Sequence, residues 1–271
     1  MPWPSWEQAS IAALLSILLW WILGRLPSTR TGAALQPAFR EFALVAGLYA
    51  VWRLARQLPI THESGAMDRA RAIDHFQHAL RLPSEIGVQH FVVDHDWLAR
   101  FVNGYYAIVH VPALIAFLVW AFWHHRDRYP HWRNGLVAVT AGCLVIRFLR
   151  VAPPRFVEEL GFVDLSSRFG LGVYGDVGTG VSDQYAAMPS IHVGWAAVVA
   201  LGVFAMSTSP VRWIVLMHLP VTVFVVAATG HHWWLDGVVA LLLLAGGLAL
   251  DTAVRRLRSA PAAPAEVTAA R

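Results

Sequence analysis

Residues 230–250 read GHHWWLDGVVALLLLAGGLAL, in which a polar cluster opens an uncharged apolar run. The apolar part approaches the ~20 residues that an α-helix needs to cross a bilayer. The same arrangement occurs at residues 189–192, PSIH, which open the run VGWAAVVALGVFAM. Together the two openings carry His192, His232 and Asp236. Ionisable groups at the ends of two membrane helices suggest a reaction centre.

The composition of the chain is that of a polytopic membrane protein. Of its 271 residues, 57% are hydrophobic and only 14% are charged, whereas a soluble domain carries about a quarter charged residues. We therefore predict an all-α bundle of six or seven transmembrane helices. The predicted spans are residues 9–26, 41–58, 101–123, 134–150, 189–207, 211–229 and 233–251.

Arginines predict the orientation of this bundle, because cytoplasmic loops of membrane proteins are enriched in basic residues. Arginines occur in the loops 25–40 and 124–133, in the connection 207–212 and in the C-terminal tail. With seven spans these segments share one side. We expect a plasma-membrane protein with its N-terminus outside, its C-terminus in the cytoplasm and both histidine motifs on the outer face.

The segment 59–100 also carries arginines, although this orientation places it outside. Its residues 65–82, GAMDRARAIDHFQHALRL, have a partial apolar stripe that is typical of an amphipathic surface helix. The stripe consists of Ala70, Ile73, Phe76, Gln77 and Leu80.

The domain organisation is predicted to be simple. Residues 1–258 form one integral membrane domain, whose catalytic core covers about 101–251, and the Ala/Pro-rich residues 259–271 form a disordered tail. All 21 basic residues are arginine, so chemistry through a lysine Schiff base is excluded. Cys143 is the one cysteine and is expected to pack as a small apolar side chain. The net charge of +4 reflects topology and does not indicate a nucleic-acid partner.

His232 and Asp236 are the first candidate pair, because residues four apart share one face of a helix. A carboxylate bonded to one imidazole nitrogen fixes the tautomer and leaves the other nitrogen as a nucleophile or base. His231 is five residues from Asp236 and is expected to point elsewhere. The alternative is a capping cluster, in which Asp236 favours the positive end of the helix dipole.

His192 and Ser190 form the second candidate group. Pro189 suits the first turn of a helix, and the free N–H groups beside Ser190 can bind an anion. His192 would then lie beside a bound phosphate and could protonate a leaving oxygen. The alternative is a histidine at the membrane interface without a ligand.

The third group lies in residues 147–156, RFLRVAPPRF, where Arg147, Arg150 and Arg155 cluster at the outer end of a predicted span. The planar guanidinium group matches phosphate oxygens and tolerates partial burial. The alternative is that these arginines anchor the helix end at the interface. His110 lies within another span, where it either lines a substrate cavity or bonds a neighbouring helix.

Taken together, the three groups supply phosphate binding, an oriented nucleophile and an acid. The segments AAMPSIHVGW and TGHHWWLD resemble the second and third signature motifs of the type 2 phosphatidic acid phosphatase superfamily. They are most similar to its branch containing inositol phosphorylceramide synthases. This resemblance implies a helical membrane fold, an outward or lumenal active site, and no metal or other cofactor.

By matching position, the resemblance implies that His232 is the nucleophile, Asp236 its partner, His192 the general acid and Ser190 a phosphate ligand. The first family motif, a lysine followed after six residues by Arg-Pro, is replaced here by RVAPPRF. Arg150 and Arg155 then take the phosphate-binding roles. The arginine that usually precedes the third motif is replaced by an apolar pair, Val225 and Val226, as in the synthase-like branch.

The leading hypothesis is therefore a lipid-phosphate phosphatase or phosphotransferase that works through a phosphohistidine at the outer membrane face. Its partners would be the bilayer and a lipid-linked phosphate or phosphodiester substrate. One alternative is an inositol phosphorylceramide synthase-like enzyme, which transfers a phosphoalcohol to a lipid acceptor. The non-enzyme alternative is an inactive family member or a membrane binding protein.

Overall fold

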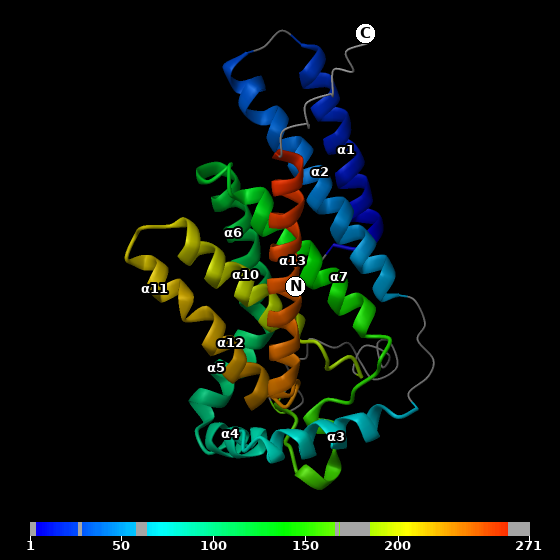
Figure 1. The fold of residues 1–271 in the computed structure, drawn as a ribbon, viewed down its shortest axis with the longest axis vertical. Coiled ribbons are helices and arrows are strands. Elements are labelled where there is room, and N and C mark those ends of the chain that lie inside the picture. The colour runs from blue at the N-terminus through cyan, green and yellow to red at the C-terminus, as the bar shows by residue number, and fades with distance from the viewer. Residues whose placement is uncertain (1–3, 27–28, 58–63, 166–167, 169–184, 260–271) are drawn as a thin grey trace, which may run out of the picture.

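The computed structural model describes residues 4–26, 29–57, 64–165, 168 and 185–259. These residues form helices and no named strand, which confirms the predicted all-α class (Figure 1). The helices are α1 (Trp6–Arg25), α2 (Arg30–Arg56), α3 (Ala66–Ala79), α4 (Glu85–Val93), α5 (Asp96–Ile108), α6 (His110–His124), α7 (Tyr129–Ile146), η1 (Pro154–Phe156), η2 (Glu158–Leu160), α10 (Ile191–Met206), α11 (Val211–Leu216), α12 (His218–Ala228) and α13 (Trp234–Ser259).

Several helices have the length and hydropathy of membrane spans. Trp6–Arg25, Val211–Ala228 and Trp234–Ser259 each meet both criteria, and the bent pair α5–α6 meets them as one span. Helices α2, α7 and α10 occupy the other three predicted segments, and α10 has only 16 residues. The chain is a membrane protein, and each of its seven predicted segments contains at least one helix. The predicted tail from residue 260 onward lies outside the described residues.

Two of the predicted spans are each divided into two helices. Helices α5 and α6 meet at a bend of 50°, and the segment 211–229 divides into α11 and α12 at Met217. Each break lies just before a proline, Pro112 or Pro220. Proline lacks the N–H that would bond the preceding turn, and its ring clashes with that turn. Val211–Ala228 still qualifies as one span, and α5 and α6 qualify together as one bent span, so the two predicted segments are supported but contain an internal break.

Helices α3 and α4 lie across one end of the bundle (Figure 1). Helix α3 confirms the helix predicted within residues 65–82, and Ala70 and Gln77 of its predicted apolar stripe are buried. Phe76 and Leu80 are instead more than half exposed, at 54% and 52%. Ile73 of the stripe is partly buried and packs against the core together with Met67, so the burial pattern is narrower than predicted only at Phe76 and Leu80.

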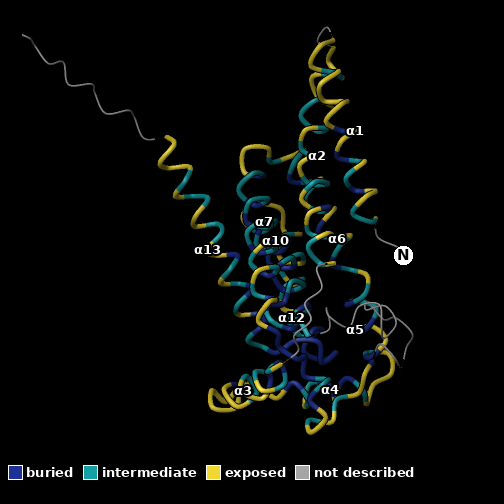
Figure 2. Tube along the Cα trace, turned by 90° about the vertical axis from the view of Figure 1, so that its right-hand side faces the viewer, coloured by how far each residue is buried: buried dark blue, intermediate teal, exposed yellow. Residues whose placement is uncertain are grey.

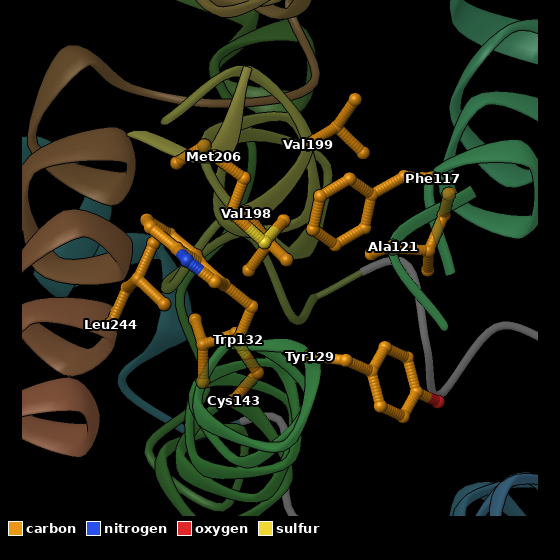
Figure 3. Close-up of a cluster of buried hydrophobic side chains, with 12 residues drawn as sticks. Phe117, Ala121, Tyr129, Trp132, Cys143, Val198, Val199, Met206 and Leu244 are labelled. Carbon is orange, nitrogen blue, oxygen red and sulfur yellow. The ribbon is translucent and has the colours of Figure 1, made fainter. Parts of the chain in front are cut away.

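The main apolar core lies where α6, α7, α10 and α13 pack together (Figure 3). Phe117, Trp132, Val198 and Leu244 are among its buried side chains, and Cys143 packs there as a small apolar residue, as predicted. Buried residues are concentrated in this core and towards the α3–α4 end of the bundle. In contrast, α1 and much of α2 are exposed along their sides (Figure 2).

Adjacent glycines of α13 give a matched test of this packing. A Cβ at Gly247 would overlap the Cβ of Ala138 on α7, whereas a Cβ at Gly246 would meet nothing within 4 Å. We expect Gly247→Ala to destabilise the protein by about 1–3 kcal/mol through overpacking. Gly246→Ala is expected to be neutral or slightly stabilising, because alanine favours helices. Thermal unfolding in detergent measures both; equal melting temperatures would contradict the close α7–α13 contact.

Candidate active site

The two histidine motifs meet at the α3–α4 end of the bundle. His232 Nδ1 lies 2.6 Å from the carbonyl oxygen of Ala187 and 3.3 Å from Asp236 Oδ2. A backbone carbonyl can only accept a hydrogen bond, so Nδ1 carries the proton and donates it. The lone pair is then on Nε2, which has no hydrogen-bond partner among the described residues. This arrangement leaves a buried imidazole nitrogen ready to act as a nucleophile.

Asp236 has two local partners. Its Oδ2 also accepts from the backbone N–H of Trp233 at 2.8 Å, next to the first residue of α13. The side chain is fully buried, and its backbone carbonyl accepts from Ser190 N–H at 3.1 Å. Asp236 therefore caps the N-terminus of α13 and contacts His232 at the same time. The capping and orienting interpretations of this residue describe one structure and do not compete.

His192 and Ser190 are placed by the start of α10. Ser190 is the N-cap residue, and its Oγ accepts from Val193 N–H at 3.4 Å. Pro189 thus precedes the cap, so its predicted place in the first turn was wrong. The His192 ring lies 5.7 Å from the His232 ring, centroid to centroid, and its Nδ1 has no hydrogen-bond partner in the described part of the chain.

The segment between α7 and η1 is linked to the site by backbone hydrogen bonds. Val151 pairs with the segment before Ser190: Val151 N–H bonds Tyr185 O at 2.9 Å, and Ala187 N–H bonds Val151 O at 3.2 Å. The carbonyl of Ala187 also contacts His232 Nδ1. The pairing of Val151 with Ala187 therefore places Arg150, the neighbour of Val151 in the chain, near the site.

The three predicted arginines have different positions. Arg147 donates to the carbonyl of Ala55 on α2 at 2.6 Å, which ties two helices together. Arg150 is almost fully buried, with 1% of its surface exposed. The backbone N–H of Arg155 bonds the carbonyl of Gly230 at 3.1 Å, beside the histidine turn. Burial, and after it the charge of Arg155, holds the pKa of His231 well below its usual range.

A row of rings continues from the site into the bundle. Tyr106 lies between His231, on which it stacks at 4.3 Å, and His192 at 4.5 Å. The His110 ring is 5.0 Å from that of His192 and 5.8 Å from that of His218. His110 Nδ1 faces a carbonyl of its own span, that of Tyr106, at 3.3 Å. The ring contacts place His110 beside the site.

Sequence reasoning missed Tyr106 and His218. A signal was present, because His110 and His218 each begin a His-x-Pro triplet within a predicted span. The proline of each triplet explains the helix break, and the histidine follows the break directly. Non-helical backbone within a membrane protein commonly lines a buried polar region.

Among the residues that the structure describes, no three His, Cys, Asp or Glu side chains come together as metal ligands. A model of the PAP2 superfamily matches residues 71–250, which is more than half of the chain and includes every candidate site residue. No curated protein and no solved structure matches the chain.

Proposed function

Because the chain belongs to the PAP2 superfamily, we propose that it transfers the phosphoryl group of a membrane lipid phosphate through a phosphohistidine on His232. One observation carries the assignment: the Ala187 carbonyl and Asp236 hold the proton of His232 on Nδ1, and Nε2 is left without a partner among the described residues. A neutral imidazole in this tautomer has its lone pair available for attack on phosphorus.

The first step of the proposed reaction forms a nitrogen–phosphorus bond at His232 Nε2. The bond between phosphorus and the leaving alcohol oxygen breaks, and His192 gives a proton to that oxygen. Asp236 and the Ala187 carbonyl stabilise the positive charge that develops on the His232 ring. The short spacing between the two imidazole rings suits attack and protonation on one phosphate group.

The second step breaks the nitrogen–phosphorus bond. Water or an acceptor alcohol attacks phosphorus, its proton passes to His192, and the electron pair returns to His232 Nε2. Water gives a phosphatase and an alcohol gives a phosphotransferase. In both cases His192 ends the cycle with the proton that it gave up in the first step.

Phosphate binding is assigned to Ser190, Arg150 and Arg155. The N-cap position of Ser190 places the N-terminal end of α10 beside His192, where the helix dipole favours a negative charge. The cations of Arg150 and Arg155 would neutralise the phosphoryl oxygens as charge develops on them. Arg147 is a weaker candidate, because it bonds the Ala55 carbonyl.

The location of the proposed reaction is the outer face of the plasma membrane. The distribution of arginines supports it, since the α6–α7 turn, at the opposite end of both helices, carries Arg126 and Arg128, and the start of α7 carries Arg133. The N-terminus would lie outside and the C-terminus in the cytoplasm. His110, next to His192, would line the inner wall of the substrate site.

A second candidate reaction is phosphoalcohol transfer of the inositol phosphorylceramide synthase type. Val225 and Val226 support it, because they are buried apolar residues where phosphatases of the family carry an arginine. Labelled lipid phosphates and phosphodiesters, supplied with and without alcohol acceptors, distinguish the reactions by their products. Absence of any product from all of them would favour an inactive member or a binding protein.

Chelation of divalent metal is expected to leave the proposed activity unchanged. The nucleophile is a histidine, and the developing charge is met by arginines and a helix N-terminus, so the proposed steps need no metal. Phosphate release from phosphatidic acid is measured before and after dialysis against EDTA. Complete loss of activity that one added metal restores would contradict the proposal.

A further inference from the structure

Two buried polar side chains at the α3–α4 end have no part in the proposed chemistry. Gln77 of α3 is 2% exposed and Glu85 of α4 is 4% exposed. A buried carboxylate is costly unless charged or polar partners compensate it. Burial accordingly raises the pKa of Glu85, and hydrogen bonds to Trp234 and Gln77 act in the opposite direction.

Both side chains bond the start of α13. Glu85 Oε1 accepts from Gln77 Nε2 at 2.7 Å and from the backbone N–H of Trp234 at 3.1 Å. Gln77 Oε1 accepts from the backbone N–H of Leu235 at 3.1 Å. The first N–H groups of a helix have no partner within it, so side chains from elsewhere must satisfy them when they are buried. Here two separate helices supply those acceptors.

The first turn of α13 contains Asp236 and begins just after His232, so it links the two members of the proposed catalytic pair. Trp234 and Leu235 lie between His232 and Asp236, and Trp233 N–H is bonded by Asp236 itself. The indole N–H of Trp234 adds a bond to the carbonyl of Pro83 at 2.6 Å. The backbone that sets the distance between His232 and Asp236 is therefore fixed by contacts from the α3–α4 end.

We infer that Gln77 and Glu85 are positioning residues, which hold the first turn of α13 so that Asp236 meets His232. Glu85 acts here as a hydrogen-bond acceptor for the first turn of α13. The kinetic part of this inference rests on the proposed function. The structural part does not, because it concerns the two amide groups directly.

Hydrogen–deuterium exchange tests the structural part on the full-length protein in detergent. In Glu85→Ala and Gln77→Leu, the amides of Trp234 and Leu235 are expected to exchange about tenfold faster, because each loses a buried acceptor. Peptides from α7 and α10 are expected to exchange as in the wild type, which shows that the protein is folded. Asp68→Asn is the matched control, since this α3 carboxylate is 84% exposed.

Glu85→Gln gives the conservative arm, because its amide oxygen can still accept from Trp234 N–H. We expect wild-type protection in this variant. Unchanged exchange at Trp234 and Leu235 in both Glu85→Ala and Gln77→Leu would overturn the inference. Faster exchange throughout the molecule in both variants would also overturn it, because the two residues would then support the fold as a whole.

Kinetics with phosphatidic acid test the catalytic part. Glu85→Ala is expected to lower kcat about tenfold with KM nearly unchanged, and Glu85→Gln to restore most of it. In the Asp236→Asn background the same change is expected to have little further effect, because both act through His232. An equal loss in both backgrounds would contradict the positioning role. A wild type inactive on all lipid phosphates, but with the predicted exchange pattern, would refute the proposed function and leave the positioning role supported.

Discussion

His232→Ala is expected to abolish phosphoryl transfer, with kcat reduced by about 10⁴–10⁶-fold. The proposed nucleophile is Nε2 of this residue, whose ring is oriented by the Ala187 carbonyl at 2.6 Å and by Asp236 at 3.3 Å. No other residue in the structure is expected to take over covalent catalysis. His192 is reserved for proton transfer, and His231 stacks on Tyr106. Phosphate release from phosphatidic acid in detergent micelles measures the loss.

The control for this variant is His124→Ala. His124 is an exposed histidine at the other end of α6, and its Nδ1 contacts a carbonyl of its own helix. It is expected to retain wild-type kcat. Both variants are compared with the wild type by thermal unfolding, so that a loss of fold is separated from a loss of chemistry. A folded His232→Ala protein with substantial activity would remove His232 as the nucleophile.

Asp236→Asn is expected to give the second largest loss of activity. Replacing the orienting carboxylate of a catalytic histidine by an amide costs about 10⁴-fold where it reverses the tautomer. Here the Ala187 carbonyl also accepts from Nδ1 and retains the proton there. We therefore expect a smaller loss of about 10²–10³-fold, which reflects the missing negative charge beside the His232 ring.

The measurement for Asp236→Asn is kcat for phosphate release, with Asp94→Asn as the control. Asp94 is an exposed carboxylate that ends α4, and its replacement is expected to have no effect. Wild-type kcat in a folded Asp236→Asn protein would show that Asp236 only caps α13 through Trp233.

The helical membrane fold could be predicted from the sequence because a membrane span is one long, continuous stretch of apolar residues. Such a stretch is recognised without knowledge of tertiary contacts. Each of the seven predicted segments contains a helix, and the boundaries moved by a few residues at most ends. The larger difference is α2, which begins at Arg30 and not at residue 41. Its early turns are less apolar than a membrane span, so hydropathy alone did not include them.

The sequence predicted that His232 and Asp236 would meet on one helix face because of their spacing. The two side chains do contact each other at 3.3 Å, but His232 lies before the first residue of α13, so they do not share a helix face. The sequence did not predict the Ala187 carbonyl, which is a closer partner of His232 than Asp236 is. Every residue has a backbone carbonyl, so the sequence does not reveal which carbonyl will contact a histidine. Its position depends on the pairing of Val151 with the segment before Ser190, which joins distant parts of the chain.

The role of the α3–α4 end was also beyond prediction from sequence. Gln77 was assigned to an apolar stripe, and α4 was not predicted at all within the segment 59–100. Their partners on α13 lie about 150 residues later in the chain, as the bonds from Trp234 and Leu235 show. Such contacts follow from tertiary packing and not from local periodicity.

The central claim is the covalent intermediate on His232, and a rapid-quench experiment tests it most directly. Phosphatidic acid labelled in its phosphate is mixed with excess enzyme, quenched in alkali within milliseconds and digested. The account predicts label on the peptide that contains His232, stable in alkali and lost in acid, as a phosphoramidate is, and no label in His232→Ala. Product formed at the wild-type rate with no labelled protein at any quench time, or label on another residue, would contradict it.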